Sequence, residues 1–570
     1  MRLKSALRRG VAAAVIAGIV VSSGIPAYAK TWNIADGDIT VKGASDESGN
    51  YNNVKQGEKD FEKDEGETVI TGESDKNTVT IDTSEGNVDV TFDDLNIDTS
   101  STGSAAVSVT GKGDTNIELD GDNELKSGRS HAGLEHNKTD TSGKLTIQDD
   151  NDEAGSLDAT GGRGGAGIGG GMSKDGQATI TGGTITANGG RLASGIGGGA
   201  GIGGGLSGDG NVRISGGTII SAVSDGSDYG GAGIGGGHGG GCHVTITGDA
   251  TVKEAQGFGG GAGIGSGVYG PIGDVEISGN ANVERAIGSD LGAGIGAGYG
   301  ESGFPNVGKV TIKDNAKIGL AKGGAGAAGI GGGYYESYIP EEDTSSSGVG
   351  DVTIEGNTTV NAVGGEGAAG IGGGVNALTV GSDDGNKITI RSNETGTPTV
   401  NATGGVSDVD SDTGETIPGG AGIGSGLGDA KADITLEGKV TITATAGKDN
   451  VAIGDKNGEQ EFNGLAEGSS ITRYDSEGND TTLPTDPGCP VPAPVPAPAS
   501  PSSSGGGSAD ASVQESVFPG LVVTDKDGQR ISYTSTQSGN TLTVCVGRFT
   551  ASLRISLAAL RQLRAEGIET

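Results

Sequence analysis

The chain has 570 residues, of which 118 are Gly, and it carries a formal net charge of −36. Aromatic residues are scarce, with 7 Phe, 10 Tyr and 1 Trp, so the composition excludes the large aromatic-rich core of an ordinary globular enzyme. Collagen is excluded because Gly does not recur at every third position and only 15 residues are Pro. The excess of acidic residues argues against nucleic acid as a partner, because binding a polyanion requires many Lys and Arg contacts.

Residues 1–29 are typical of a secretory signal peptide. A basic start is followed by an apolar stretch over residues 11–21 and by the A-x-A cleavage pattern Ala27-Tyr28-Ala29. The apolar stretch is short for a membrane span, and no second span follows it. We therefore predict a mature chain that begins at Lys30 and is secreted into the extracellular space, where it either diffuses or is held at a cell surface.

Residues 30–160 are the most acidic part of the chain and contain alternating runs such as Val90–Ile97 and Ala105–Val109. Alternation of apolar and polar residues predicts strands with one buried face. We interpret this segment as the acidic first coils of a β-solenoid.

A repeated glycine-rich module dominates residues 161–455. Its centre is A-G-I-G or a close variant, and it occurs around Ile168, Ile196, Ile202, Ile234, Ile264, Ile295, Ile330, Ile371, Ile423 and Ile453. Short alternating runs such as 178–181 and 184–187 lie between the modules. Each unit therefore predicts about three short strands that stack in parallel, and fixed modules joined by loops of variable length are typical of solenoids.

A corner residue separates the first two runs of each unit. Asn occupies this corner at Asn280, Asn315, Asn357 and Asn393. Because Asn tolerates the left-handed conformation and its amide can bond to an equivalent amide one coil away, we predict an asparagine ladder.

These Asn corners, V-x-I-x strands and G-A-G-I-G-G-G modules resemble secreted right-handed parallel β-helix proteins of clostridia and other Gram-positive gut bacteria, which are named carbohydrate-binding domain-containing proteins. The resemblance covers roughly residues 66–455. It implies an all-β, right-handed parallel β-helix. It also implies noncovalent binding of acidic polysaccharide, assisted by Ca²⁺.

Three further segments follow the repeats. Residues 456–484 are predicted to end the solenoid, and the Pro, Ser and Gly residues of 485–508 are typical of a spacer. Residues 509–570 predict a small α+β module, with strands at 521–524, 531–535 and 541–546 and a helix over 556–566. Residues 568–570 look like the start of another strand, so this module is expected to be incomplete.

Tyrosines gather in the middle of the repeats and provide the first candidate site. Aligning the units on the Ile of A-G-I-G places several Tyr residues four or five positions after it, and rings on a rigid face suit stacking on sugars. The candidate carbohydrate-binding tyrosines are Tyr229, Tyr269, Tyr299, Tyr334 and Tyr335. Packing beneath inserted loops is the structural alternative. Arg163 and Arg191, each five positions before an Ile, could clamp a uronate carboxylate.

Metal sites are suggested by acidic strings. Asp408, Asp410 and Asp412 are the candidate Ca²⁺ ligands, although Gly414 falls one place late for an EF-hand loop. His238, Cys242 and His243 superficially resemble zinc ligands, but no second ligand pair accompanies them. Cys489 and Cys545 could form a disulfide, and three cysteines are too few for a disulfide framework.

The sequence thus predicts a secreted β-helix that binds polysaccharide noncovalently and is not an enzyme. Two alternatives remain open. One is a structural adhesin or scaffold that binds protein partners, and the other is a β-helix polysaccharide lyase, for which no complete catalytic set is visible in the sequence.

Overall fold

The computed structural model describes residues 30–488 and four later strands, at 521–524, 533–538, 541–546 and 552–555. Gaps within the first range lie at 48, 65, 152, 193–196, 227–228, 272, 302–307, 337–350, 377–385, 410–415, 428–430 and 456. The predicted signal peptide, most of the predicted spacer and the predicted helix at 556–566 lie outside the described residues.

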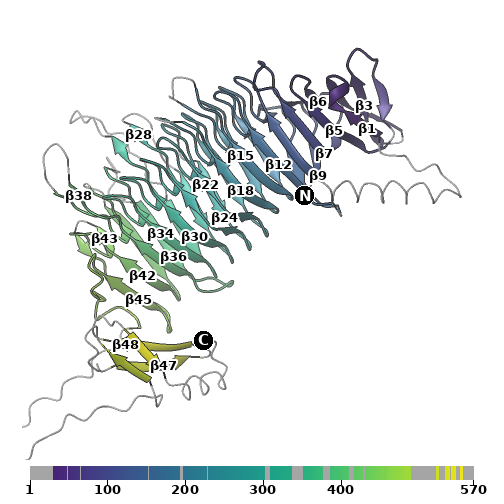
Figure 1. Ribbon diagram of the computed structural model, residues 1–570. Helices are drawn as coiled ribbons and strands as arrows, with labels where there is room; N and C mark the ends of the chain where they lie inside the picture. The colour runs from purple at the N-terminus through teal and green to yellow at the C-terminus, as the bar shows by residue number, and fades with distance from the viewer. Residues whose placement is uncertain are drawn as a thin grey trace, which may run out of the picture.

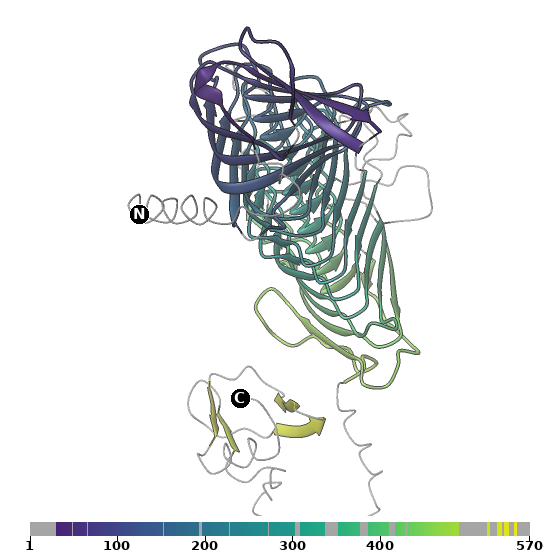
Figure 2. The same cartoon turned by 90° about the vertical axis from the view of Figure 1, so that its right-hand side faces the viewer.

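The chain forms a right-handed parallel β-helix, which confirms the predicted fold class. One coil consists of β14 (Gly176–Ile180), β15 (Thr184–Asn188) and β16 (Ile202–Gly203), and its strands pair in parallel with those of the coils on either side. The coils follow one another in a single elongated row (Figure 1), and strands of successive coils overlap when the row is viewed obliquely from its N-terminal coils (Figure 2).

Three parallel ladders run along this row. The first contains β1 (Lys30–Asn33), β5 (Thr68–Ser74), β7 (Val88–Asp98), β9 (Thr115–Lys126), β11 (Leu145–Gln148), β14, β17 (Gly210–Ile214), β20 (Cys242–Ile246), β24 (Asp274–Ile277), β29 (Lys309–Ile312), β33 (Asp351–Glu355), β36 (Asn386–Arg391) and β41 (Ala432–Glu437). The second contains β12 (Gly155–Thr160), β15, β18 (Thr218–Val223), β21 (Thr251–Val252), β22 (Ala255–Gln256), β25 (Asn282–Val283), β26 (Ala286–Ile287), β30 (Lys317–Lys322), β34 (Thr359–Val363), β37 (Thr399–Thr403), β42 (Thr441–Thr445) and β45 (Ser470–Tyr474). The long strands β7 and β9 extend from the first ladder into the second.

The third ladder carries the glycine modules. It contains β2 (Ile39–Asp46), β6 (Val79–Thr83), β8 (Val107–Gly111), β10 (Leu134–His136), β13 (Ile168–Gly169), β16, β19 (Ile234–Gly235), β23 (Ile264–Gly265), β27 (Ile295–Gly296), β31 (Ile330–Gly331), β35 (Ile371–Gly372), β40 (Ile423–Gly424) and β43 (Ile453–Asp455).

The remaining short elements lie outside the three ladders, and the last four of them follow the solenoid in the sequence. They are the 3-10 helix η1 (Ile34–Asp36), β3 (Gly49–Gln56), β4 (Glu62–Asp64) and β44 (Gly458–Glu459), and the pairs β28 (Gly300–Glu301) with β32 (Tyr335–Glu336), β38 (Asp408–Val409) with β39 (Thr416–Ile417), β46 (Leu521–Thr524) with β49 (Ser552–Ile555), and β47 (Tyr533–Ser538) with β48 (Thr541–Val546).

The core is a narrow set of aliphatic columns. In the third ladder Ile168 pairs with Ile202, and Ile202 pairs with Ile234, and all three side chains are fully buried. Alternation within the first ladder buries Ile180 and Ile214 in the same way. Because each coil adds the same few apolar side chains, the interior needs almost no aromatic residues, as the composition indicates.

Glycine is required where the coils approach most closely. The Gly after each third-ladder Ile, from Gly169 to Gly454, has a φ between 126° and 151°, a region that side chains rarely adopt. A Cβ atom on Gly203 would also lie 2.0 Å from the carbonyl oxygen of Gly235 in the next coil.

The asparagine ladder forms, with one change from the prediction. Asn315 donates to Asn280 Oδ1 at 3.1 Å, and Asn357 donates to Asn315 Oδ1 at 3.2 Å. Asn393 instead accepts bonds from the backbone and hydroxyl of Thr395. In the three coils whose Asn residues bond to one another, the left-handed residue is the one before the Asn: Gly279, Asp314 and Gly356. That residue makes the turn, so the Asn amide can bond along the axis.

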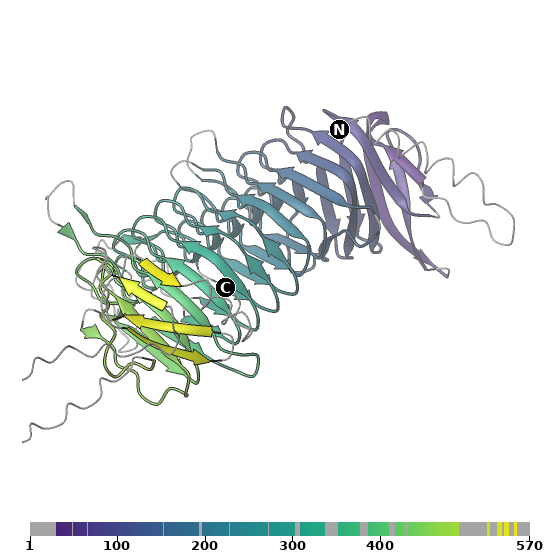
Figure 3. The same ribbon diagram turned by 60° about the horizontal axis from the view of Figure 1, so that its bottom comes forward.

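Both ends of the solenoid are closed. At the first, β3 pairs antiparallel with β2 and β4 among the purple strands of Figure 3. Trp32 Nε1 donates to Asp64 at 2.8 Å. At the other, the fully buried Arg473 bonds both carboxylate oxygens of Asp486, at 2.7 and 2.9 Å, and also bonds Glu459. Polar side chains buried at these ends are therefore paired.

We expect Gly203→Ala to lower stability by at least about 1–3 kcal/mol, because it forces a side chain into a strained φ and against the next coil. Thermal unfolding followed by circular dichroism measures the change. Gly103→Ala is the matched control, since nothing lies within 4 Å of its added Cβ. Equal melting temperatures for the two variants would contradict the role given to Gly203.

Candidate functional site

Four tyrosines that are far apart in the sequence form a continuous ring stack. Tyr269 lies between Tyr229 and Tyr299, with ring centroids 5.5 and 5.3 Å away, and Tyr334 lies 6.0 Å beyond Tyr299. The imidazole of His238 contacts the end of the stack, at 6.0 Å from Tyr229 and 5.8 Å from Tyr269. We call these five residues the tyrosine stack.

Backbone bonding between coils sets the spacing of this stack. Tyr269 N donates to the carbonyl of Tyr299 at 2.7 Å, so consecutive rings are held one coil apart. Tyr269 adopts a φ of 59°, which turns the chain outward after the module. Tyr335 is placed differently, because it is 5% exposed and its backbone pairs with Gly300.

The ring faces in the stack cover one another, and Tyr299 is only 5% exposed. Tyr269 donates its hydroxyl to Glu301 at 3.1 Å, and Tyr299 donates its hydroxyl to Glu336. Burial raises the pKa of both phenols, and the neighbouring carboxylates raise it further. The stack thus offers hydroxyls and carboxylates to a ligand more readily than it offers ring faces.

A groove with basic side chains lies along another edge of the solenoid. It consists of two adjoining cavities of about 400 and 410 Å³, which share Thr160, Gly161 and Arg163. Its charged and aromatic lining residues are Lys126, Arg129, Arg163, Arg191, Asp225 and Phe258. We call this surface the basic groove.

The repeat places these side chains in register. Arg129 and Arg163 occupy equivalent turns of consecutive coils, because Ser130 N donates to the carbonyl of Arg163 at 3.1 Å. Arg191 follows on the next coil, since Gly164 N donates to Gly190 at 2.9 Å. Arg129 and Arg163 therefore recur at the coil spacing of about 4.8 Å.

Arg191 is not in a module of its own, as the sequence alignment had suggested. Ile168 pairs with Ile202, so the stretch from Arg191 to Gly198 is an insertion within one coil, closed by a bridge between these two residues. The A-G-I-G pattern recurs inside this insertion around Ile196, which lies outside the described residues, and this recurrence made it look like a separate repeat.

Charge and exposure distinguish the groove from the rest of this acidic chain. Arg129, Arg163 and Arg191 are exposed, and Arg191 lies 3.7 Å from Asp225. Arg129 and Arg163 form no ion pair within the part of the chain that the structure describes. Phe258 is 38% exposed, which is unusual for a Phe and provides an apolar face beside the cations. The site residues predicted from the sequence did not include Lys126, Arg129 or Phe258.

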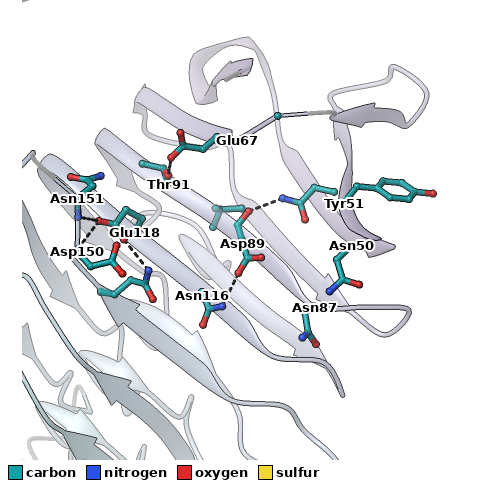
Figure 4. Close-up of a pocket in the computed structure, with 14 residues that line it drawn as sticks. Asn50, Tyr51, Glu67, Asn87, Asp89, Thr91, Asn116, Glu118, Asp150 and Asn151 are labelled. Carbon is teal, nitrogen blue, oxygen red and sulfur yellow. Dashed lines mark hydrogen bonds between the residues drawn. The ribbon is translucent and has the colours of Figure 1, made fainter. Parts of the chain in front are cut away.

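A polar cavity of about 440 Å³ lies on the outer surface of the first coils (Figure 4). Ten of its 14 lining residues carry an amide or a carboxylate, among them Asn50, Asn87, Asp89, Asn116, Glu118 and Asn151. Many of these groups bond one another. Asn116 donates to Asp89 at 2.6 Å, and Glu118 accepts the backbone N–H of Asp150 at 2.9 Å. The ring of Tyr51 points away from the other labelled side chains. The polar groups of this surface therefore satisfy much of one another's hydrogen-bonding capacity.

The metal candidates from the sequence remain predictions. Asp410 and Asp412 lie outside the described residues, and only the backbone of Asp408 is described, in β38. Among the described residues, no group of three or more His, Cys, Asp or Glu side chains is placed to hold a metal ion. Cys242 is buried in the core, where burial raises the pKa of its thiol to about 12, whereas the neighbouring His243 is exposed.

The tyrosine stack makes the free energy of unfolding fall at alkaline pH. Because the phenol pKa values are raised in the fold, the stabilisation is complete below the unfolded value of about 10 and is lost as pH rises above it. We expect Tyr299→Phe to flatten the fall in urea midpoint measured above pH about 10. Tyr51→Phe, remote from the stack, is the control, and parallel profiles for the wild type and Tyr299→Phe would contradict the assignment.

A family model described as a beta helix repeat matches residues 212–238, 244–268, 275–299 and 352–375. Each match starts in a strand of the first ladder and ends four residues after a buried Ile of the third, so it covers one coil. None of the curated proteins and none of the solved structures compared matches the chain. Within the described residues, no helix is long and apolar enough to cross a membrane. The repeat matches and the three ladders together identify the chain as a parallel β-helix protein.

Proposed function

We propose that the protein binds polysaccharide noncovalently in the extracellular space, and that the basic groove is where it does so. The observation that carries this proposal is the exposed Phe258 ring in a groove lined by Arg163 and Arg191. An apolar ring beside fixed cations suits a ligand with flat sugar rings and anionic groups.

An acidic polysaccharide is the favoured ligand. Arg side chains bind carboxylates through two parallel hydrogen bonds, and the groove supplies Arg129, Arg163 and Arg191 on neighbouring coils. Cations repeated at about 4.8 Å suit a linear chain that lies along the solenoid axis. A local positive potential in an otherwise negative protein also directs a polyanion to this one edge.

Ca²⁺ is proposed as an assisting ion. The chain and an acidic polysaccharide repel one another over most of the surface, since the net charge is −36. Ca²⁺ binds carboxylate oxygens and can link those of the ligand to those of the protein. The ion would therefore strengthen attachment outside the groove without replacing the Arg contacts.

We expect Arg163→Ala to weaken the binding of polygalacturonate by about tenfold, the equivalent of 1.4 kcal/mol. Arg163→Lys should recover only part of the affinity, because Lys cannot form the paired hydrogen bonds. Affinity electrophoresis and calorimetry, each with Ca²⁺ and with a chelator, measure the effect, and dextran serves as the uncharged ligand.

Arg213→Ala is the matched control, because Arg213 is exposed on the first ladder, outside the groove. Phe258→Ala should weaken binding at every salt concentration, whereas the Arg163 effect should shrink as salt rises. No retention of any acidic polysaccharide by the wild type would refute the proposed function. Equal losses in Arg163→Ala and Arg213→Ala would refute the groove.

A further inference from the structure

Tyr269 joins the tyrosine stack through an unusual backbone conformation. Its φ of 59° lies in the left-handed region, which bulky side chains rarely adopt. The equivalent turns of other coils carry small or amide residues there, with φ between 56° and 77°, at Ser173, Ser207, Gly239 and Asn376. A large ring at this position therefore requires a reason beyond turning the chain, and strain of this kind gathers at functional sites.

This conformation places the Tyr269 ring beside that of Tyr299. The ring centroids lie 5.3 Å apart with an interplanar angle of 49°, closer than the 5.5 and 6.0 Å of the two flanking tyrosine pairs. Tyr269 N donates to the carbonyl of Tyr299 at 2.7 Å. The backbone thus fixes the two side chains on adjacent coils.

The hydroxyl ends of these two rings also lie close together. Tyr269 donates to Glu301 at 3.1 Å and Tyr299 donates to Glu336, and the two glutamates pair in register on β28 and β32. Burial and the Glu336 carboxylate raise the pKa of the Tyr299 phenol, whereas a hydrogen bond with the Tyr269 side chain acts in the opposite direction. The ortho carbons, which flank each hydroxyl-bearing carbon, are therefore neighbours.

These contacts meet the requirements for joining two phenols by oxidation. A phenol loses its proton as it loses an electron, and each hydroxyl here already bonds a carboxylate that can accept the proton. Tyr269 is partly exposed, so an oxidant can reach its ring. Tyr299 is only 5% exposed, but it can pass its electron to the adjacent oxidised ring.

We propose that Tyr269 and Tyr299 form a site of oxidative modification, at which a haem peroxidase supplied with hydrogen peroxide joins the two rings by a carbon–carbon bond. The product, dityrosine, is a covalent link between adjacent coils. A link between residues 30 positions apart restricts the unfolded chain as a disulfide does, so it stabilises this part of the solenoid. The inference goes beyond polysaccharide binding and does not depend on it.

The reaction balances with hydrogen peroxide as the oxidant. Each phenol gives up one electron, and its proton passes to Glu301 or Glu336. The two phenoxyl radicals then form a bond between their ortho carbons, and the hydrogens of these carbons move to the phenolic oxygens, which restores both aromatic rings. The two electrons and two protons that leave the protein reduce one hydrogen peroxide to two water molecules.

The test is treatment of the full chain, at low concentration, with hydrogen peroxide and a haem peroxidase. We expect dityrosine fluorescence from monomeric protein, a mass lower by two hydrogen atoms, and a cross-linked peptide pair that contains Tyr269 and Tyr299. The urea midpoint of the oxidised protein should rise. Tyr269→Phe and Tyr299→Phe retain the rings without the reactive hydroxyl, so each should lose this peptide pair and the rise in midpoint.

Tyr51→Phe is the matched control and should keep the cross-link, because Tyr51 lies outside the stack and its ring contacts Lys63. Glu336→Gln retains both phenols but removes one proton acceptor, so cross-linking should be slower. Absence of the Tyr269–Tyr299 peptide pair after Tyr51 has reacted, or a link chiefly between other tyrosines, would refute the proposed site. An undiminished rate in Glu336→Gln would refute the role given to the carboxylate.

Discussion

Direct hydrogen bonding between successive coils is the constraint on which the rest of the molecule depends. At the third ladder the backbones approach so closely that a Cβ on Gly203 would lie 2.0 Å from the neighbouring carbonyl oxygen. Glycine is therefore a packing requirement in this fold and does not indicate flexibility. The same approach keeps the aliphatic columns narrow, because each coil encloses only a few Ile, Val and Ala side chains.

Strict coil stacking also creates the functional surfaces. Any side chain that repeats at one position of the coil becomes part of a column, with a spacing that the backbone sets. Tyr269 and Tyr299 are stacked for this reason, and Arg129 and Arg163 line one groove for the same reason. Function in such a molecule is acquired by substitution within a column, without any change in the fold.

The sequence was sufficient for the fold because its signals are periodic. The buried Ile positions, the strand alternation and the Asn280–Asn315 bond all follow from the repeat. The sites were harder to predict. Insertion of residues 191–198 into one coil mimicked a module, and the mutual covering of the tyrosine faces depends on side-chain packing. Arg129 was missed because the module of its coil reads A-G-L-E, and a search for A-G-I-G does not reach it. Alignment on the third-ladder register, in which Leu134 pairs with Ile168, would have revealed it.

The covering of the two solenoid ends affects whether further chains can add to them. A stack of parallel strands exposes unpaired N–H and C=O groups at each terminus, and such edges template the addition of further chains. The antiparallel β3 covers one terminus, and the buried Arg473 with Asp486 and Glu459 anchors the chain that closes the other. Covering of these strand edges disfavours end-to-end growth of the kind that open stacks of β-strands undergo in amyloid.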